Sequence, residues 1–172
     1  MMFVTATCID NWVNMLKRAI IVNHHPLIKY LNEKYSELLE PILEPFQCKA
    51  GTVVFQQGTP ADHLYLVIEG KVDVTYKPYD GVAITVYHVG KDGLFGWSAV
   101  VGSEKYTSSA TAIETLEAVR LHGSDLRKLC VEHPDAGRDI LESLAGAVSS
   151  RWQDAQNQVK FILEQGMKDK RE

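Results

Sequence analysis

Cysteine is scarce in this chain, and its three copies are scattered. Cys8, Cys48 and Cys130 are odd in number, and no two of them have the C-x-x-C spacing of a metal or redox site. Such usage is typical of a reducing compartment and argues against a disulfide framework. No stretch approaches the roughly 18 uninterrupted apolar residues of a membrane span, and polar residues interrupt the N-terminal region too often for a signal peptide. These absences predict a cytoplasmic protein that does not enter a membrane.

Positive charge is also sparse and never gathers into a long run. The 172 residues include 18 Lys and Arg against 22 Asp and Glu, which gives a formal net charge of −4. A nucleic-acid-binding surface normally shows a basic patch or stripe, so the composition argues against nucleic acid as a partner of this chain. The mixed charges after Gly166 are typical of a solvated tail, which we assign to residues 166–172.

Motifs for metal binding or covalent catalysis are missing. The histidines are either adjacent or in separate segments: His24, His25, His63, His88, His122 and His133. A His-x-His with a following Glu, as in cupin-type metal sites, is absent, and no Ser-His-Asp or Cys-His arrangement can be assembled. The sequence therefore predicts no enzyme, no metal and no haem.

The N-terminal region has the pattern of an amphipathic helix. Its apolar residues recur at helical spacing on one face: Ile9, Trp12, Val13, Leu16 and Ile20. Only Lys17 and Arg18 supply positive charge, so we expect this helix to dock on the rest of the chain rather than on a membrane. The step His24-His25-Pro26 breaks the pattern, because the residue before proline avoids the α region. Residues 1–30 are predicted to be a helical extension.

From about residue 46 to residue 121 the hydrophobic period becomes two. Val72, Val74 and Tyr76 alternate with polar residues, and the segment 82–86 alternates in the same way through Val82, Ile84 and Val86. Turn signals rich in Gly, Asp and Pro separate these short runs. Many short strands at regular spacing predict a mainly β domain, either a sandwich or a jelly roll, with helices on both sides of it in the sequence.

Several motifs together resemble the cyclic-nucleotide-binding domain family. They are Leu38-Leu39-Glu40-Pro41, Lys49-Ala50-Gly51, Phe55-Gln56-Gln57-Gly58, the strand Leu64–Gly70, the loop Gly93–Thr111 and the strand Leu116–Leu121. The resemblance implies a double-stranded β-helix jelly roll of eight strands over residues 31–133. It also implies a short helix inside a phosphate-binding cassette and a long C-terminal helix over 134–165 that dimerises or covers the pocket.

The cassette departs from the family pattern at both charged positions. In the family, Phe-Gly-Glu opens a short helix, and an Arg about ten positions on pairs with the cyclic phosphate while the carboxylate accepts the ribose hydroxyl. Here Phe95 and Gly96 stand, but Trp97 replaces the carboxylate and Tyr106 the guanidinium. Each missing contact costs about 2–3 kcal/mol, so both would weaken nucleotide binding by ~10³–10⁴-fold.

The ligand that the cassette accepts stays open at this point. The candidate binding residues are Phe95, Gly96, Trp97, Ser98, Tyr106, Thr107 and Ser108. In one hypothesis the ring of Trp97 fills the space of the sugar and closes the pocket. In the other, Trp97 and Tyr106 form an aromatic-walled site for a planar or apolar ligand.

The C-terminal region has the pattern of a helix with a dimerisation seam. Apolar residues step by four and three in alternation: Leu141, Ala145, Val148, Trp152, Ala155, Val159 and Ile162. This period of 3.5 is the spacing of a coiled coil and predicts a homodimer, whereas the alternative is that the face packs on its own barrel. Trp152 is either a seam residue or a lid over the cassette.

The sequence as a whole predicts a non-enzymatic regulatory or sensor module that forms a homodimer and acts on a downstream protein. The alternatives are a true cyclic AMP- or cyclic GMP-binding signal-transduction protein and the sensor fragment of a transcription regulator. Only residues 166–172 follow Gln165, which leaves no room for a DNA-recognition helix. No cofactor is expected, apart from a cyclic nucleotide in the first alternative.

Overall fold

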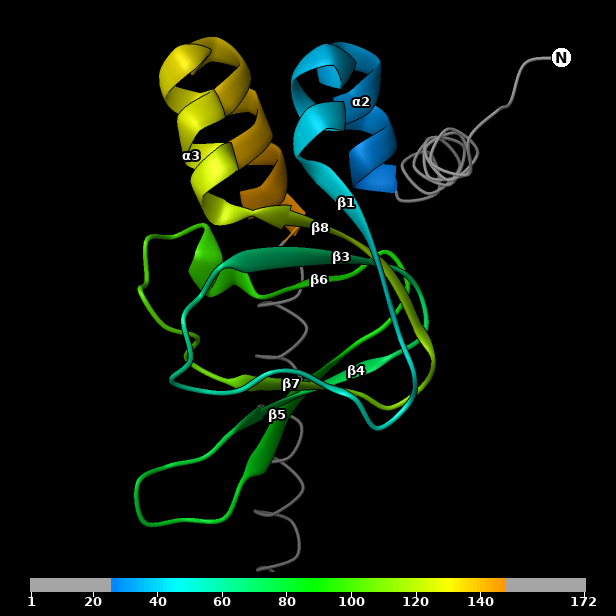
Figure 1. Ribbon diagram of the computed structural model, residues 1–172, viewed down its shortest axis with the longest axis vertical. Coiled ribbons are helices and arrows are strands. Elements are labelled where there is room, and N and C mark those ends of the chain that lie inside the picture. Colours follow the sequence, from blue (N-terminus) through cyan, green and yellow to red (C-terminus); the bar gives the residue numbers. More distant parts are fainter. Residues whose placement is uncertain (1–25, 148–172) are drawn as a thin grey trace, which may run out of the picture.

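The computed structural model describes residues 26–147 of the chain. Over this range eight strands form two four-stranded antiparallel sheets, with the strand orders β1-β8-β3-β6 and β2-β7-β4-β5 (Figure 1). The strands are β1 (Leu43–Cys48), β2 (Val53–Phe55), β3 (His63–Glu69), β4 (Val72–Tyr76), β5 (Ile84–Val89), β6 (Leu94–Phe95), β7 (Ser109–Ala112) and β8 (Leu116–His122). Strands distant in sequence are neighbours in each sheet, and the predicted jelly roll is confirmed.

Helices cover one face of this barrel. Figure 1 shows α2 (Pro26–Leu39) and α3 (Gly123–Glu132) side by side over the sheet that contains β8 and β3. The short helix η1 (Glu40–Ile42) leads from α2 into β1, and residues 134–147 are helical. Within the described residues, no helix is long and apolar enough to span a membrane.

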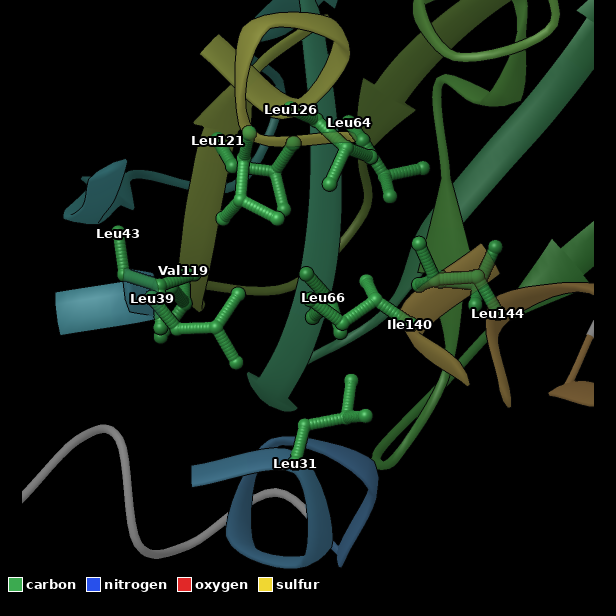
Figure 2. Close-up of a cluster of buried hydrophobic side chains, with 12 residues drawn as sticks. Leu31, Leu39, Leu43, Leu64, Leu66, Val119, Leu121, Leu126, Ile140 and Leu144 are labelled. Carbon is green, nitrogen blue, oxygen red and sulfur yellow. The ribbon is translucent and has the colours of Figure 1, made fainter. Parts of the chain in front are cut away.

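Strand β3 separates two hydrophobic cores because its side chains alternate between the faces of the sheet. Leu64 and Leu66 face the helices and belong to a leucine cluster, which Figure 2 shows together with Leu31 of α2 and Ile140 of the last helix. Tyr65 and Val67 face the other sheet and belong to an aromatic cluster inside the barrel. These four consecutive side chains, at residues 64–67, are almost completely buried.

A polar contact ties the last described helix to α2. The Tyr35 hydroxyl donates a hydrogen bond to Asp139 Oδ2 at 2.5 Å, and the Lys34 ammonium pairs with the same carboxylate. The hydrogen bond from Lys34 lowers the pKa of Asp139 below its usual range, and the bond from Tyr35 acts in the same direction. Tyr35 itself has a non-helical backbone (φ −135°, ψ 32°), so α2 is kinked at the residue that makes this contact.

The hairpin of β4 and β5 departs from the pattern expected for a half-buried strand. The segment 82–86 has alternating apolar residues, yet Val82, Ile84 and Val86 are all exposed, with Val82 retaining 81% of its accessible surface. A bulge between Val74 and Thr75 shifts the register against β5, and only Val89 of β5 is buried. Strand β5 lies at the edge of its sheet and extends beyond the core that would cover it.

Candidate functional site

The predicted cassette, residues 93–111, contains β6, the connection that follows it and the start of β7. Its Gly96 has φ +82°, a conformation that favours glycine. A Cβ at this position would lie 2.6 Å from the carbonyl oxygen of His63, so a side chain is excluded by space as well. The next residues form η2 (Trp97–Ala99), a 3₁₀ helix of three residues, where the resemblance implies a short helix.

Tyr106 points into the barrel rather than toward a ligand. Its side chain is buried, and its ring stacks on Phe55 with centroids 3.7 Å apart and an interplanar angle of 8°. The hydroxyl donates a hydrogen bond to the carbonyl oxygen of His63 at 2.8 Å and accepts one from the His63 N–H at 3.0 Å. Both hydrogen-bonding functions of the phenol are therefore satisfied by the backbone at the start of β3.

The surroundings of Tyr106 keep its phenol neutral. Burial is the main cause that raises its pKa to about 12, because the charged phenolate is disfavoured in a poorly solvated site. Two further rings continue the cluster, since Phe95 stacks on Tyr65 with centroids 4.8 Å apart and an interplanar angle of 8°. The position that carries the phosphate-binding guanidinium in the family pattern is thus occupied by a packed, uncharged aromatic group.

Trp97 lies in a different environment from Tyr106. Its half-buried side chain packs against the leucine cluster under the helices, whereas Tyr106 belongs to the aromatic cluster between the sheets. The structure therefore does not bring the two rings into one wall, as the aromatic-site hypothesis requires. Phe95 does join Tyr106 in the aromatic cluster.

The remaining cassette residues offer neutral hydroxyl groups near the surface. Ser98 Oγ lies 3.5 Å from Thr107 Oγ1, which joins the two ends of the cassette loop. Ser109 Oγ accepts a hydrogen bond from the Gln57 N–H at 2.9 Å and so is already engaged with the β2–β3 loop. Ser108 is half-buried. These hydroxyl groups are uncharged, and Lys105, which adjoins Tyr106, is exposed.

Helix α3 contacts η2, the short helix of the cassette, through two residues that the sequence analysis did not identify. The guanidinium of Arg127 donates a hydrogen bond to the carbonyl oxygen of Ala99 at 2.8 Å. Gly123, at the start of α3, approaches the same carbonyl so closely that a Cβ there would lie 2.1 Å from its oxygen. Both contacts meet at Ala99 and join η2 to α3.

A pair of histidines lies where β3 begins and β8 ends, next to the backbone that binds Tyr106. The rings of His63 and His122 have centroids 4.9 Å apart, and His122 Nδ1 accepts a hydrogen bond from the Ser124 N–H at the start of α3. Burial first, and then the charge of Arg120, lower the pKa of His63. The described residues contain no group of three or more His, Cys, Asp or Glu side chains suited to a metal ion.

The sequence positions that form the predicted seam are described only in part. Leu141 and Ala145 lie on the helix over 134–147, and both are exposed. Ile140 and Leu144 of the same helix are buried in the leucine cluster. The other seam residues, Val148, Trp152, Ala155, Val159 and Ile162, lie outside the described residues.

Comparisons with known proteins agree with this geometry. A family model described as a cyclic nucleotide-binding domain matches residues 45–133. The CRP-like cAMP-activated global transcriptional regulator of Mycobacterium tuberculosis is 32% identical over 103 residues, which cover 60% of this chain and 46% of that protein. The chain thus spans about half the length of this curated relative.

Solved structures show the same fold. A cyclic nucleotide-binding domain from Methylobacillus flagellatus superposes with a TM-score of 0.65 at 18% identity, covering 76% of this chain and 83% of that one. The regulatory subunit of a cAMP-independent protein kinase A from Trypanosoma brucei gives a TM-score of 0.64 at 15% identity, covering 87% and 53%. With a family model that spans more than half of its residues, this chain belongs to the cyclic nucleotide-binding domain family.

Proposed function

We propose that this chain is a non-enzymatic regulatory module that works as a homodimer and does not hold a cyclic nucleotide through its cassette. The observation that carries the proposal is the inward orientation of Tyr106, whose hydroxyl is bonded to the backbone of His63. A side chain held in this way cannot reach out to a phosphate unless its two hydrogen bonds and its stack on Phe55 are broken.

The contacts that a nucleotide could make in this cassette are weaker than those of the family pattern, which favours the inward orientation of Tyr106. A nucleotide entering the cassette would gain no ion pair with the residue at position 106, and it would find no carboxylate at position 97. Charge-assisted hydrogen bonds are worth about twice as much as neutral ones, so the hydroxyls of Ser98 and Thr107 do not replace these contacts. The M. tuberculosis relative is cAMP-activated, whereas the T. brucei protein kinase A whose regulatory subunit has this fold is cAMP-independent, so the fold occurs in proteins of both kinds.

The contacts around Ala99 support a mechanism for signalling in the proposed module. A ligand other than a cyclic nucleotide, or a partner protein, that binds at the cassette would displace η2. The displacement would in turn shift α3, because Arg127 and Gly123 of α3 both contact Ala99 of η2. The helix that follows α3 is in turn tied to α2 through Asp139. A ligand or partner that prefers one position of these helices would shift the equilibrium between two states of the module.

The first test is thermal unfolding of the full chain with and without cyclic AMP or cyclic GMP at millimolar concentration. A ligand present at 100 times its Kd adds ~2.7 kcal/mol and would raise Tm by roughly 5–10 °C in a domain of this size. We expect no change in Tm for either nucleotide. A rise that saturates with cyclic AMP and is not produced by linear AMP would contradict the proposal and identify a second-messenger sensor.

The homodimer is supported by the two faces of the last described helix. Ile140 and Leu144 pack within the chain, while Leu141 retains 38% of its accessible surface on the face where the seam begins. We expect Leu141→Glu to weaken the dimer about a hundredfold, because it places a carboxylate in an apolar contact. Sedimentation velocity should show a monomer at concentrations where the unmodified chain is a dimer.

The matched control for the seam is Val131→Glu. Val131 is an apolar residue of α3 with 79% exposure, and it is not part of the seam pattern. This variant should sediment like the unmodified chain. If both variants remain dimers, the predicted seam does not hold the subunits together.

A further inference from the structure

A histidine caps the junction between β8 and α3. Strand β8 ends at His122 and α3 begins at the next residue, so no loop separates them (Figure 1). His122 Nδ1 accepts a hydrogen bond from the Ser124 N–H at 3.2 Å and lies 2.7 Å from Ser124 Oγ. The imidazole thus satisfies one of the N–H groups that have no acceptor at the start of a helix. The usual capping residues are Ser, Thr, Asp and Asn, and none of them changes its charge near neutral pH.

We propose that His122 makes the start of α3 a pH-sensitive switch, in which the first turn is held while the imidazole is neutral and released when it is protonated. Nδ1 accepts a hydrogen bond only through its lone pair, so the neutral ring carries its proton on Nε2. The imidazolium ion has a proton on both nitrogens and accepts no hydrogen bond. Protonation therefore leaves the Ser124 N–H without its acceptor. It also places a positive charge at a helix N-terminus, which the helix dipole disfavours.

The charged groups around the junction do not replace the lost acceptor. They lie on β1, β3, β8, α3 and the turn before β3, and they are Glu44, Asp62, His63, Arg120, Asp125 and Arg127. The carboxylate of Glu44 is already paired with Arg120. Asp125 attracts a positive ring, but it lies in the first turn of the helix and not at the N-cap position.

His63 acts in the same direction as the cap. Its ring centroid lies 4.9 Å from that of His122. Burial lowers the pKa of His63, and the charges of Arg120 and His122 lower it further. The folded protein thus favours the neutral form of His63, so the contribution of this residue to stability is present at high pH and is lost as the pH falls. Acid therefore weakens the junction through both histidines.

The first turn of α3 is also where this helix meets the cassette. The Gly123 N–H donates a hydrogen bond to the Asp62 carbonyl oxygen at 2.8 Å, and the Gly123 Cα packs against the Ala99 carbonyl. Arg127, four positions later, donates its hydrogen bond to the same Ala99 carbonyl. Release of this turn should therefore alter η2 as well, so that pH changes the cassette without a ligand bound to it.

The protonation state of His122 in the full chain is the first measurement, because it needs no variant. Long-range ¹H–¹⁵N spectra distinguish a protonated ring nitrogen from an unprotonated one. At pH 8 we expect Nδ1 of His122 to be unprotonated and Nε2 to carry the proton. Between pH 8 and pH 5, where histidine side chains change charge, the amide resonance of Ser124 should shift together with the ring nitrogens. The amides of η2 should shift over the same pH range.

Hydrogen exchange measures how strongly the cap holds the helix. Between pH 8 and pH 5, protection factors in the first turn of α3, corrected for the intrinsic pH dependence of exchange, should fall about five- to tenfold, as expected for the loss of an N-cap. His122→Asn retains a capping side chain that does not titrate, so it should keep the protection at both pH values. His122→Ala has no cap and should show low protection at both.

Two further variants serve as controls. His133→Asn is matched, because His133 is exposed at the opposite end of the same helix, and it should keep the pH dependence of the unmodified chain. His63→Asn should also retain a loss of protection in acid, which would assign the loss to His122. The amides of β3 and β8 in the same spectra report whether a variant remains folded.

Three outcomes would overturn the proposal. A proton on Nδ1 of His122 at pH 8 would mean that the cap is not made. An equal loss of protection in His122→Asn would assign the pH dependence to another group. Protection that stays constant between pH 8 and pH 5 in the unmodified chain would mean that the cap does not hold the helix. The cap includes no residue of the predicted seam and no ligand, so these results and the tests of the proposed function are independent.

Discussion

Replacing Tyr106 by alanine should lower the free energy of unfolding by about 3–5 kcal/mol, the usual cost of removing a large aromatic side chain from a core. The variant loses the stack on Phe55 and leaves the His63 N–H and carbonyl without the hydroxyl that bonds both. For a chain of this length the loss corresponds to a decrease in Tm of roughly 10 °C. Chemical denaturation followed by circular dichroism measures it directly.

Two other tyrosine variants identify the cause of this effect. Tyr106→Phe keeps the ring and removes only the hydroxyl, so its expected cost is about 1–3 kcal/mol from the unsatisfied backbone groups. Tyr79→Ala is the exposed control, since Tyr79 is fully accessible at the tip of the β4–β5 hairpin, and it should change stability by less than about 0.5 kcal/mol. If Tyr106→Ala cost no more than Tyr79→Ala, the ring would not be a core residue in solution.

Restoring both charges of the family cassette should create nucleotide binding that the unmodified chain lacks. We expect Trp97→Glu/Tyr106→Arg to bind cyclic AMP at least ~10³-fold more tightly than the unmodified chain, because two charge-assisted contacts of about 2–3 kcal/mol each are regained. An arginine at position 106 leaves the aromatic cluster and turns its guanidinium toward the cassette, since a buried unpaired charge is costly. Isothermal titration calorimetry with cyclic AMP and linear AMP measures the gain and its specificity.

The control for this experiment is Trp97→Gln/Tyr106→Gln, which removes the same two aromatic rings and introduces no charge. Its affinity for cyclic AMP should remain close to that of the unmodified chain. If the charged double variant is folded and still does not bind, the cassette differs from the family in more than its two charges. In that case the neutral hydroxyl groups of Ser98 and Thr107 are the next place to examine.

The fold was predictable because its signals are local in the sequence. The strand ending at Gly70 is one of the motifs that resemble the family, and it forms β3, which is almost entirely buried from Leu64 to Val67. Gly70 follows with φ +95°, which explains the glycine at that turn. The glycine of the cassette is explained in the same way, since Gly96 lies against the His63 carbonyl. In both cases a glycine in the sequence indicates a left-handed backbone conformation that other residues rarely adopt.

The candidate site was less predictable because its contacts are distant in the sequence. Tyr106 bonds to His63, 43 positions away, and nothing in the local pattern of the cassette shows that the ring turns inward. Arg127 reaches Ala99 across 28 positions for the same reason. The β5 segment illustrates a related limit, since alternation in 82–86 indicates a strand but does not show whether anything covers its apolar side chains.

Strand β3 also determines how the described domain should come apart. Leu64 and Leu66 hold the helical layer, and Tyr65 and Val67 hold the interior of the barrel, on adjacent residues of one strand. Neither layer can separate without exposing apolar side chains that share a backbone with the other. Helices and barrel should therefore behave as a single cooperative unit, so that partial unfolding is rare and proteases find few intermediate forms to cleave.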